Sequence, residues 1–193
     1  TVNSGNKVYD GEALTVSGFV GETENGIPVT ADGKTYYVKG LSASATGTNV
    51  SDSTSVNATG TAQVVDEAGN DVTSEFQVTV NPGSLTINKR PVTLTSATLS
   101  KEYDGTALVN GETPLATEEG WVEGEGANYQ FTGSVTLPGA TAPNAYTYTA
   151  KEGTDFNNYS ISYNEGQLSI TSKEAKYEVQ VTVNSGNKEY DGE

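Results

Sequence analysis

The 193-residue chain contains no cysteine, no histidine and no methionine, and it has a single tryptophan. Without cysteine there are no disulfides and no thiol nucleophiles, and without histidine the Ser-His-Asp and Cys-His catalytic groups cannot form. Metal sites built on Cys or His ligands are excluded for the same reason. These absences remove most familiar catalytic chemistry, so we expect no enzyme, no catalytic residues and no cofactor.

Basic residues are also scarce, with 10 Lys and Arg against 25 Asp and Glu and a formal net charge of −15. Phosphate contacts need a basic surface, which argues against a nucleic-acid partner. No stretch approaches the roughly 18 consecutive apolar residues of a membrane span, and no charged-then-apolar leader opens the sequence. We therefore expect a soluble, extracellular fragment with no membrane insertion.

The sequence repeats itself at two distances. Residues 1–12 read TVNSGNKVYDGE and residues 182–193 read TVNSGNKEYDGE, so eleven of twelve positions agree across a period of 181 residues. A looser copy begins inside this period, where Tyr103 follows Tyr9 at a distance of 94 residues. The long period therefore contains two units, each larger than the roughly 20–50 residues of a solenoid repeat.

The ends of the two units agree as well, because residues 76–87 resemble residues 159–170 at a distance of 83. Each unit is predicted to be a separate small domain. The expected boundaries are 1–90 for unit one, 91–172 for unit two, and 173–193 for a linker and the first strand of a further repeat.

Hydrophobic periodicity predicts strands throughout and no helix. Phe76, Val78 and Val80 alternate with polar residues, which is typical of a strand with one buried face. The turn residues at 81–84 and 164–167 each predict a hairpin. Other expected strands lie at residues 14–20, 35–39, 61–65, 92–99, 129–131 and 146–150.

Short strands separated by turn signals, in units of about 90 residues, favour two-sheet sandwiches. The expected fold is all-β, with two tandem immunoglobulin-like β-sandwich domains followed by the opening strand of a third repeat. A very short linker and strong negative charge predict a monomer whose units lie end to end as a rod.

Paired motifs give the chain a family resemblance. The run Asp-Val-Thr-x-x-Phe-x-Val-Thr-Val at residues 71–80, the run Leu-Thr-Ile-x-Lys-Arg-Pro-Val-Thr-Leu at 85–94, and Lys-Glu-Tyr-Asp-Gly-Thr at 101–106 resemble YDG- and MBG-type repeats. Those repeats are tandem all-β modules of large bacterial surface proteins and adhesins. The resemblance covers both units and implies a secreted or cell-wall-anchored stalk on the bacterial cell surface, with no catalytic residues.

The Lys-x-Tyr-Asp-Gly motif, at residues 7–11 and again at 101–105, is either a repeated binding site or a structural turn. We favour the turn, because Gly supplies a positive φ and Asp accepts a bond from the amide two residues on. The tyrosine is then expected to pack at the edge of its domain.

One acidic loop is a candidate calcium site, since calcium takes six to eight oxygen ligands. The candidate ligands are Asp66, Glu67, Asn70 and Asp71. The loop lacks the spacing of an EF-hand and has no closing Glu at the twelfth position. A solvated hairpin loop is the alternative that we favour.

Aromatic residues give the candidate ligand site. Glutamates at positions 118, 119, 123 and 125 surround Trp121, as carboxylates surround an aromatic in glycosidases and sugar-binding clefts. Their spacing fixes no catalytic pair, so a charged loop anchored by one aromatic is the simpler interpretation. The residues offered for binding host glycan or protein are Trp121, Tyr129, Tyr36 and Tyr37.

A stalk without cysteine could also be cross-linked by a Lys-Asn or Lys-Asp isopeptide bond. Candidate lysines are Lys7, Lys39, Lys89 and Lys101, and candidate partners are Asn81, Asp155 and Asn158. Solvated lysines that pack only their stems are the alternative.

Two functions therefore compete. The first is a spacer that contacts only neighbouring repeats of its own chain and projects a distal adhesive head. The second is an adhesion module that binds host glycan or protein and gains avidity from repetition. A spacer should bury or scatter its aromatics, whereas an adhesive unit should expose a cluster of them.

Overall fold

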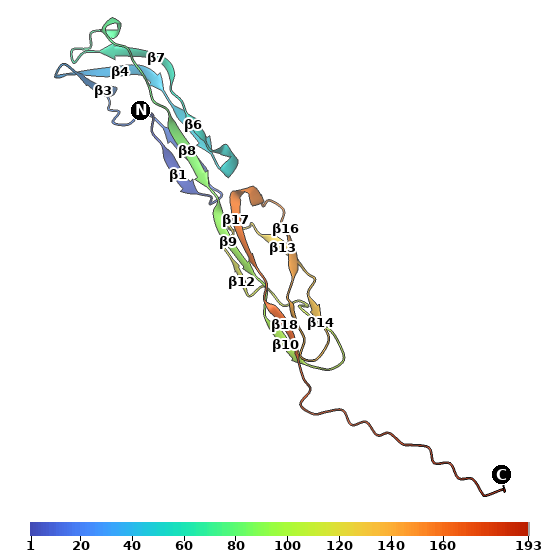
Figure 1. Cartoon of the computed structure of the whole chain (residues 1–193). Coiled ribbons are helices and arrows are strands. Elements are labelled where there is room, and N and C mark those ends of the chain that lie inside the picture. The colour runs from blue at the N-terminus through green and yellow to red at the C-terminus, as the bar shows by residue number, and fades with distance from the viewer. Residues whose placement is uncertain (193) are drawn as a thin grey trace.

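The computed structural model describes residues 1–192, in which the regular elements are β-strands and three short 3₁₀ turns. The turns are η1 (Val50–Asp52), η2 (Thr73–Glu75) and η3 (Phe156–Asn158). The predicted all-β class is confirmed, and the several sheets are consistent with β-sandwich domains. Figure 1 shows an elongated molecule, with the first strands at one end and the C-terminal segment leaving the other.

Every strand pairing in the described chain stays within residues 1–88 or within residues 90–171, which we name the first unit and the second unit. In the first unit, β8 (Gly83–Asn88) lies between β1 (Gly5–Val8), parallel to it, and β6 (Thr54–Val56), antiparallel to it. β2 (Leu14–Ser17) pairs with β5 (Ser44–Gly47). β4 (Lys34–Ser42) lies between β3 (Ile27–Ala31) and β7 (Thr59–Val65).

In the second unit, β9 (Arg90–Thr95) lies between β12 (Thr117–Glu119), antiparallel to it, and β17 (Tyr159–Asn164), parallel to it. β18 (Gln167–Thr171) lies between β10 (Leu99–Glu102), parallel, and β15 (Thr141–Pro143), antiparallel. Two further pairs are β13 (Ala127–Phe131) with β16 (Tyr146–Ala150), and β11 (Leu108–Val109) with β14 (Ser134–Val135).

The two hairpins predicted at residues 81–84 and 164–167 are wrong. β17 runs parallel to β9, and β18 runs parallel to β10. In both ladders each residue pairs with the residue 69 positions later in the sequence, as Arg90 does with Tyr159 and Leu99 with Leu168. The chain therefore steps from one sheet to another without reversing. Glycine is needed at positions 83 and 166 because another backbone segment lies close to each of them. An added Cβ would lie 1.9 Å from the Asn3 carbonyl oxygen at Gly83 and 2.4 Å from the Ala97 carbonyl oxygen at Gly166.

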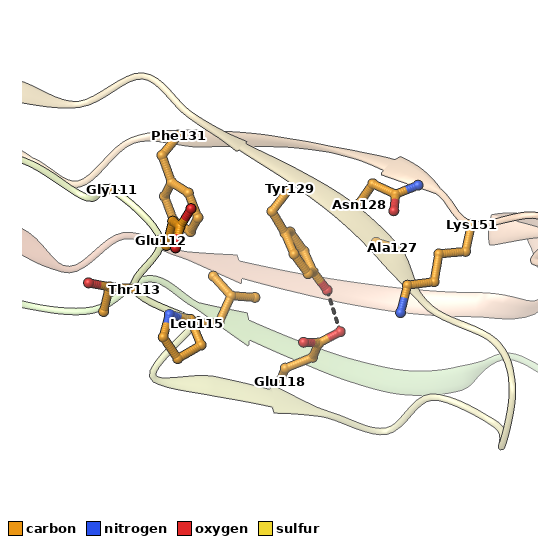
Figure 2. Close-up of a pocket in the computed structure, with 11 residues that line it drawn as sticks. Gly111, Glu112, Thr113, Leu115, Glu118, Ala127, Asn128, Tyr129, Phe131 and Lys151 are labelled. Carbon is orange, nitrogen blue, oxygen red and sulfur yellow. Dashed lines mark hydrogen bonds between the residues drawn. The ribbon is translucent and has the colours of Figure 1, made fainter.

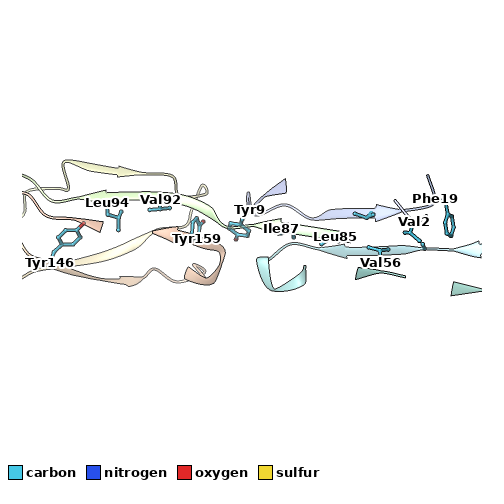
Figure 3. Packing of buried hydrophobic residues seen from close by; sticks show 12 residues of the cluster. Val2, Tyr9, Phe19, Val56, Leu85, Ile87, Val92, Leu94, Tyr146 and Tyr159 are labelled. Carbon is cyan, nitrogen blue, oxygen red and sulfur yellow. The ribbon is translucent and has the colours of Figure 1, made fainter. Parts of the chain in front are cut away.

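Buried side chains form one cluster that continues from the first unit into the second (Figure 3). Leu85 and Ile87 of β8 and Val92 and Leu94 of β9 belong to it, although only Lys89 separates the two strands. The alternation of β8 and β9 explains this burial, because successive side chains point to opposite faces of a strand. A second, smaller cluster at the far end of the second unit contains Val135, Leu168 and Ile170.

Residues 172–192 form no strand and extend away from the body (Figure 1). The start of this tail is held by Glu102, which accepts a bond from the Glu174 amide at 3.2 Å and lies 4.0 Å from the Lys173 ammonium. Val179, Val181 and Val183 are each more than 80% exposed. Glu193, the last residue of the predicted further repeat, lies outside the described residues.

Candidate functional site at the junction of the units

The Lys-x-Tyr-Asp-Gly motif forms the predicted turn in both units. In the first copy, the Asp10 carboxylate accepts a bond from the Glu12 amide at 2.9 Å, and Gly11 has a φ of 82°. In the second copy, Asp104 accepts from the Thr106 amide at 2.9 Å, and Gly105 has a φ of 87°. These bonds confirm the turn interpretation.

The motif lysine closes each turn by pairing with the motif aspartate. The ammonium of Lys7 lies 2.5 Å from Asp10, and that of Lys101 lies 2.9 Å from Asp104. The lysine hydrogen bond holds the pKa of each aspartate below its usual range. The motif therefore uses its own charges to fix a local turn, which places the tyrosine at the end of the unit.

Tyr9 lies between the two units and is only 5% exposed. Its hydroxyl donates to Glu125 Oε1 at 2.6 Å, while the hydroxyl of Tyr159 donates to Glu125 Oε2 at 2.8 Å. The two rings meet edge to face with centroids 5.4 Å apart. Burial, followed by the bond to Glu125, raises the pKa of Tyr9 to about 12. One carboxylate thus joins a tyrosine from each unit.

Asn158 and Arg90 of the second unit make further hydrogen bonds across the junction. The Asn158 side chain accepts a bond from the Val50 amide at 2.9 Å and donates to Asn49 at 2.9 Å, linking η3 to η1. The guanidinium of Arg90 donates to the Tyr9 carbonyl of the first unit at 3.5 Å, and it is held in place within its own unit by a bond to the Gly120 carbonyl at 2.5 Å. These contacts, together with the tyrosine pair, restrain bending and rotation between the units.

Trp121 supports the junction from the second unit. Its ring stacks on Phe156 with centroids 5.8 Å apart and meets Tyr159 edge to face at 4.8 Å. A shallow depression beside it is lined by Arg90, Glu123 and Glu125, among others. The tryptophan offered as a ligand platform therefore packs on Phe156 and on Tyr159, one of the two tyrosines that join the units.

The predicted acidic cluster around Trp121 is divided between two places. Glu125 faces the junction, whereas Glu118 accepts a bond from the Tyr129 hydroxyl at 2.7 Å in a separate groove on the second unit (Figure 2). That groove has a volume of about 490 Å³, and Lys151 and Phe131 also line it. Burial and the Glu118 bond raise the pKa of Tyr129.

Tyr36 and Tyr37 lie in the other unit, away from Trp121 and Tyr129. The ring of Tyr36 packs on Phe76 with centroids 4.9 Å apart, and Tyr37 pairs with Val65 across β4 and β7. The structure therefore does not bring the four predicted ligand residues together.

The candidate calcium loop uses its carboxylates within its own turn. Asp66 accepts from the amides of Ala68 and Asn70 at 3.0 and 2.8 Å, and Asp71 accepts from the Thr73 hydroxyl at 2.6 Å. The bonds from Thr73 and Gln63 lower the pKa of Asp71 to about 2. Within residues 1–192, no group of three or more acidic side chains is placed to hold a metal ion.

Three of the isopeptide candidates are likewise engaged elsewhere. Lys7 and Lys101 pair with the aspartates of their own turns, and Asn158 bonds to Val50 and Asn49. In the described chain, no hydrogen bond or ion pair joins a candidate lysine to a candidate partner. From the sequence, Asn158 was considered only as an isopeptide partner and Glu125 only as a member of the acidic cluster around Trp121. Their contribution to the junction was not predicted.

Comparisons with known protein families, curated proteins and solved structures found no match. Among the described residues, no helix has the length and hydrophobicity needed to cross a membrane.

Proposed function

We propose that this chain is a non-catalytic extracellular spacer from a large bacterial surface protein, in which tandem repeats project a distal adhesive head. The observation that carries the proposal is the junction, where Glu125 binds the hydroxyls of Tyr9 and Tyr159 from the two units. A spacer transmits position only if its units cannot fold back on each other. A shared, half-buried carboxylate and a one-residue connection at Lys89 supply that restraint.

Composition and repetition support the same role. A net charge of −15 disfavours collapse of neighbouring units and keeps such a surface soluble. The near-identical copy at a period of 181 residues suits a length-setting array, because a single catalytic pocket needs no such redundancy. The resemblance to YDG- and MBG-type repeats supports a bacterial cell-surface setting.

The alternative is an adhesion module that binds host glycan or protein. The groove beside Tyr129 favours it, since an aromatic ring with Glu118 and Lys151 nearby offers stacking and hydrogen bonding to a sugar (Figure 2). The separation of Tyr129 from Tyr36 and the packing of Trp121 argue against a shared aromatic platform. Glycan-array binding that Tyr129→Ala abolishes and Tyr36→Ala retains would establish this alternative.

Small-angle scattering tests the spacer. A compact chain of this length has a radius of gyration of about 16 Å. Two end-to-end units, each about 40 Å long at about 3.3 Å per strand residue, should give about 25 Å or more. The matched variant Tyr9→Ala should broaden the distribution of shapes, while Tyr103→Ala should not. A value near 16 Å for the unaltered chain would exclude a rigid spacer.

A further inference from the structure

β13 has one edge that no strand of the described chain covers, because it pairs with β16 alone. Just before this ladder, the Lys151 amide donates to the Gly126 carbonyl at 3.0 Å. Hydrogen-bonded pairs alternate with non-bonded pairs along an antiparallel ladder. The backbone N–H and C=O groups of Ala127, Tyr129 and Phe131 therefore point away from β16. In the part of the chain that the structure describes, these groups have no hydrogen-bond partner.

The groove beside Tyr129 follows this free edge. Its volume is about 490 Å³, and a hollow of about 430 Å³ adjoins it, since Gly111, Tyr129 and Phe131 line both. The rings of Tyr129 and Phe131 are half-buried and present aromatic surface beside the unpaired backbone groups. Figure 2 shows Tyr129 of β13 and Glu118 of β12 reaching toward each other across the groove. The strand edge and the groove thus form one elongated surface.

In the first unit, a strand covers the edge that is free in the second. Residues 34–40, KTYYVKG, align with residues 127–133, ANYQFTG, at a distance of 93. The pairing agrees, because Val38 of β4 and Phe131 of β13 each lie opposite a buried residue of the next strand. β3 runs antiparallel along the other edge of β4. The first unit therefore shows that this edge accepts an extended strand.

The second unit uses the segment equivalent to β3 at the junction instead. Between β12 and β13 it has residues 120–126, GWVEGEG, where the first unit has residues 26–33, GIPVTADG. Residues 120–126 form no strand. They place Trp121 against Phe156, and they place Glu125 against the two tyrosines that join the units. The segment that builds the junction is therefore not available to cover β13.

β3 defines the chemistry of a segment that fits the free edge. Its half-buried residues are Ile27, Val29 and Ala31, all apolar, and the two residues between them are exposed. Asp32 follows the last of these residues. At the equivalent end of the second unit, Lys151 lines the groove and forms no ion pair with the residues that the structure describes. An acidic residue at the Asp32 position of an added strand would meet this ammonium group.

We propose that the free edge of β13 binds an extended peptide segment of another protein by strand addition. The segment runs antiparallel to β13 and has three apolar residues at alternate positions, followed by an acidic residue. Its apolar residues lie opposite Phe131, Tyr129 and Ala127 in turn, which copies the register of β3 on β4. Main-chain hydrogen bonds give affinity, and the alternating side chains give specificity. The inference goes beyond the spacer role and does not depend on it.

Hydrogen exchange of the unbound full chain tests the edge itself. The amides of Tyr129 and Phe131 should exchange at least about tenfold faster than those of Tyr36 and Val38, because β3 covers the equivalent edge in the first unit. The comparison needs no substitution, so folding cannot confuse it. Addition of a binding peptide should slow the Tyr129 and Phe131 amides at least about tenfold.

The probe is a synthetic peptide of residues 26–32, GIPVTAD, with blocked ends, titrated into the full chain and followed by NMR. Saturable binding is expected below about 1 mM peptide. Ile27→Thr together with Val29→Thr in the peptide should weaken binding at least about tenfold, because these side chains face the groove. Thr30→Ser, at an outward position, should change it less than about threefold.

Methylation of the peptide backbone separates strand addition from binding through side chains alone. In the proposed register, the Val29 amide points at β13 and the Thr30 amide points away. N-methylation of Val29 should therefore weaken binding at least about tenfold, whereas N-methylation of Thr30 should change it less than about threefold.

A pair of charge changes tests the direction of the peptide. Lys151→Gln in the chain should weaken binding of the unaltered peptide about threefold. The peptide variant Asp32→Asn should bind the unaltered chain about threefold more weakly, and it should bind Lys151→Gln with no further loss. Independent losses that multiply would show that the acidic residue does not meet Lys151.

Three results would overturn the proposal. The first is slow exchange of the Tyr129 and Phe131 amides in the unbound chain, equal to that of Tyr36 and Val38. The second is absence of saturable binding up to about 1 mM peptide, or equal weakening by the two N-methyl groups. The third is a groove that binds neutral oligosaccharides and not the peptide, which would assign it to the glycan alternative.

Discussion

Tyr9 and Tyr103 occupy the same position in two copies of one turn, yet their side chains do different things. Their backbone amides donate to the last residue of the neighbouring strand in the same way, to Asn88 at 2.9 Å and to Thr171 at 3.0 Å. The Tyr9 ring then enters the next unit and reaches Glu125. The Tyr103 ring is half-buried and packs on the small cluster of its own unit. The motif fixes the backbone, and the neighbouring unit decides the role of the ring.

The largest difference should come from removing the two rings. Tyr9→Ala is expected to lower the free energy of unfolding by about 3 kcal/mol, as for other large-to-small substitutions of buried aromatics. Tyr103→Ala should cost about 1 kcal/mol, because that ring lies partly in water. Urea unfolding followed by circular dichroism measures both. Equal losses would mean that the junction adds nothing to the burial of Tyr9.

Removing the shared carboxylate should have the next largest effect. Glu125→Ala leaves the hydroxyls of Tyr9 and Tyr159 without their acceptor and should cost about 2 kcal/mol. Glu123→Ala removes an exposed glutamate two residues away and should stay within about 0.5 kcal/mol. The same unfolding experiment compares them. If the two variants lose the same stability, Glu125 does not join the units.

The turn glycines allow a finer comparison. Gly11→Ala and Gly105→Ala each force an L residue to positive φ, at a cost of about 1–2 kcal/mol. A Cβ at Gly11 would lie 3.3 Å from Val122 of the second unit, whereas one at Gly105 would meet nothing within 4 Å. Gly11→Ala should therefore be the more destabilising of the two in thermal unfolding. The reverse order would show that Val122 moves aside without cost.

The smallest effect is the alkaline response of the junction. The pKa of Tyr9 is raised to about 12 in the folded chain, against about 10 when unfolded, so the unfolded state loses its proton first. The contribution is complete below about pH 10 and disappears as the pH rises towards 12. Tyr9→Phe should flatten the fall in stability over this window, as measured by unfolding at fixed pH values. Because the pKa of Tyr159 is also raised, part of the fall in stability at alkaline pH should remain in this variant. An unchanged slope in Tyr9→Phe would contradict this assignment.

Local patterns predicted several of the strands and the motif turn, because both depend on neighbouring residues. The alternation at residues 92–94 and the Asp-Gly pairs at 10–11 and 104–105 needed no distant partner to be interpreted. The same reasoning failed at Gly83 and Gly166, where glycine is required because a backbone segment from a distant part of the sequence lies close. The alternation at residues 76–80 also failed to give a strand, since a ladder needs a partner in register.

Buried polar groups show the other limit of local reasoning. Asn144 is fully buried and donates to Asn110 at 2.6 Å and to the Ala97 carbonyl at 2.8 Å, yet neither asparagine stands out in the sequence. Glu125 stood out only as one of four glutamates near Trp121. Its role depends on a tyrosine 116 residues earlier in the chain, a separation that no local pattern encodes.

The sequence by itself determined an all-β chain, its internal repeat and the Lys-Asp-Gly turn, because these follow from side-chain periodicity, self-similarity and bonds between residues two or three positions apart. Only the tertiary structure decided that Tyr9 enters the next unit, that Glu125 accepts bonds from two tyrosines and that residues 76–80 form no ladder with any of residues 1–192. Each of these depends on which distant backbone lies alongside, and therefore on the packing of the whole chain.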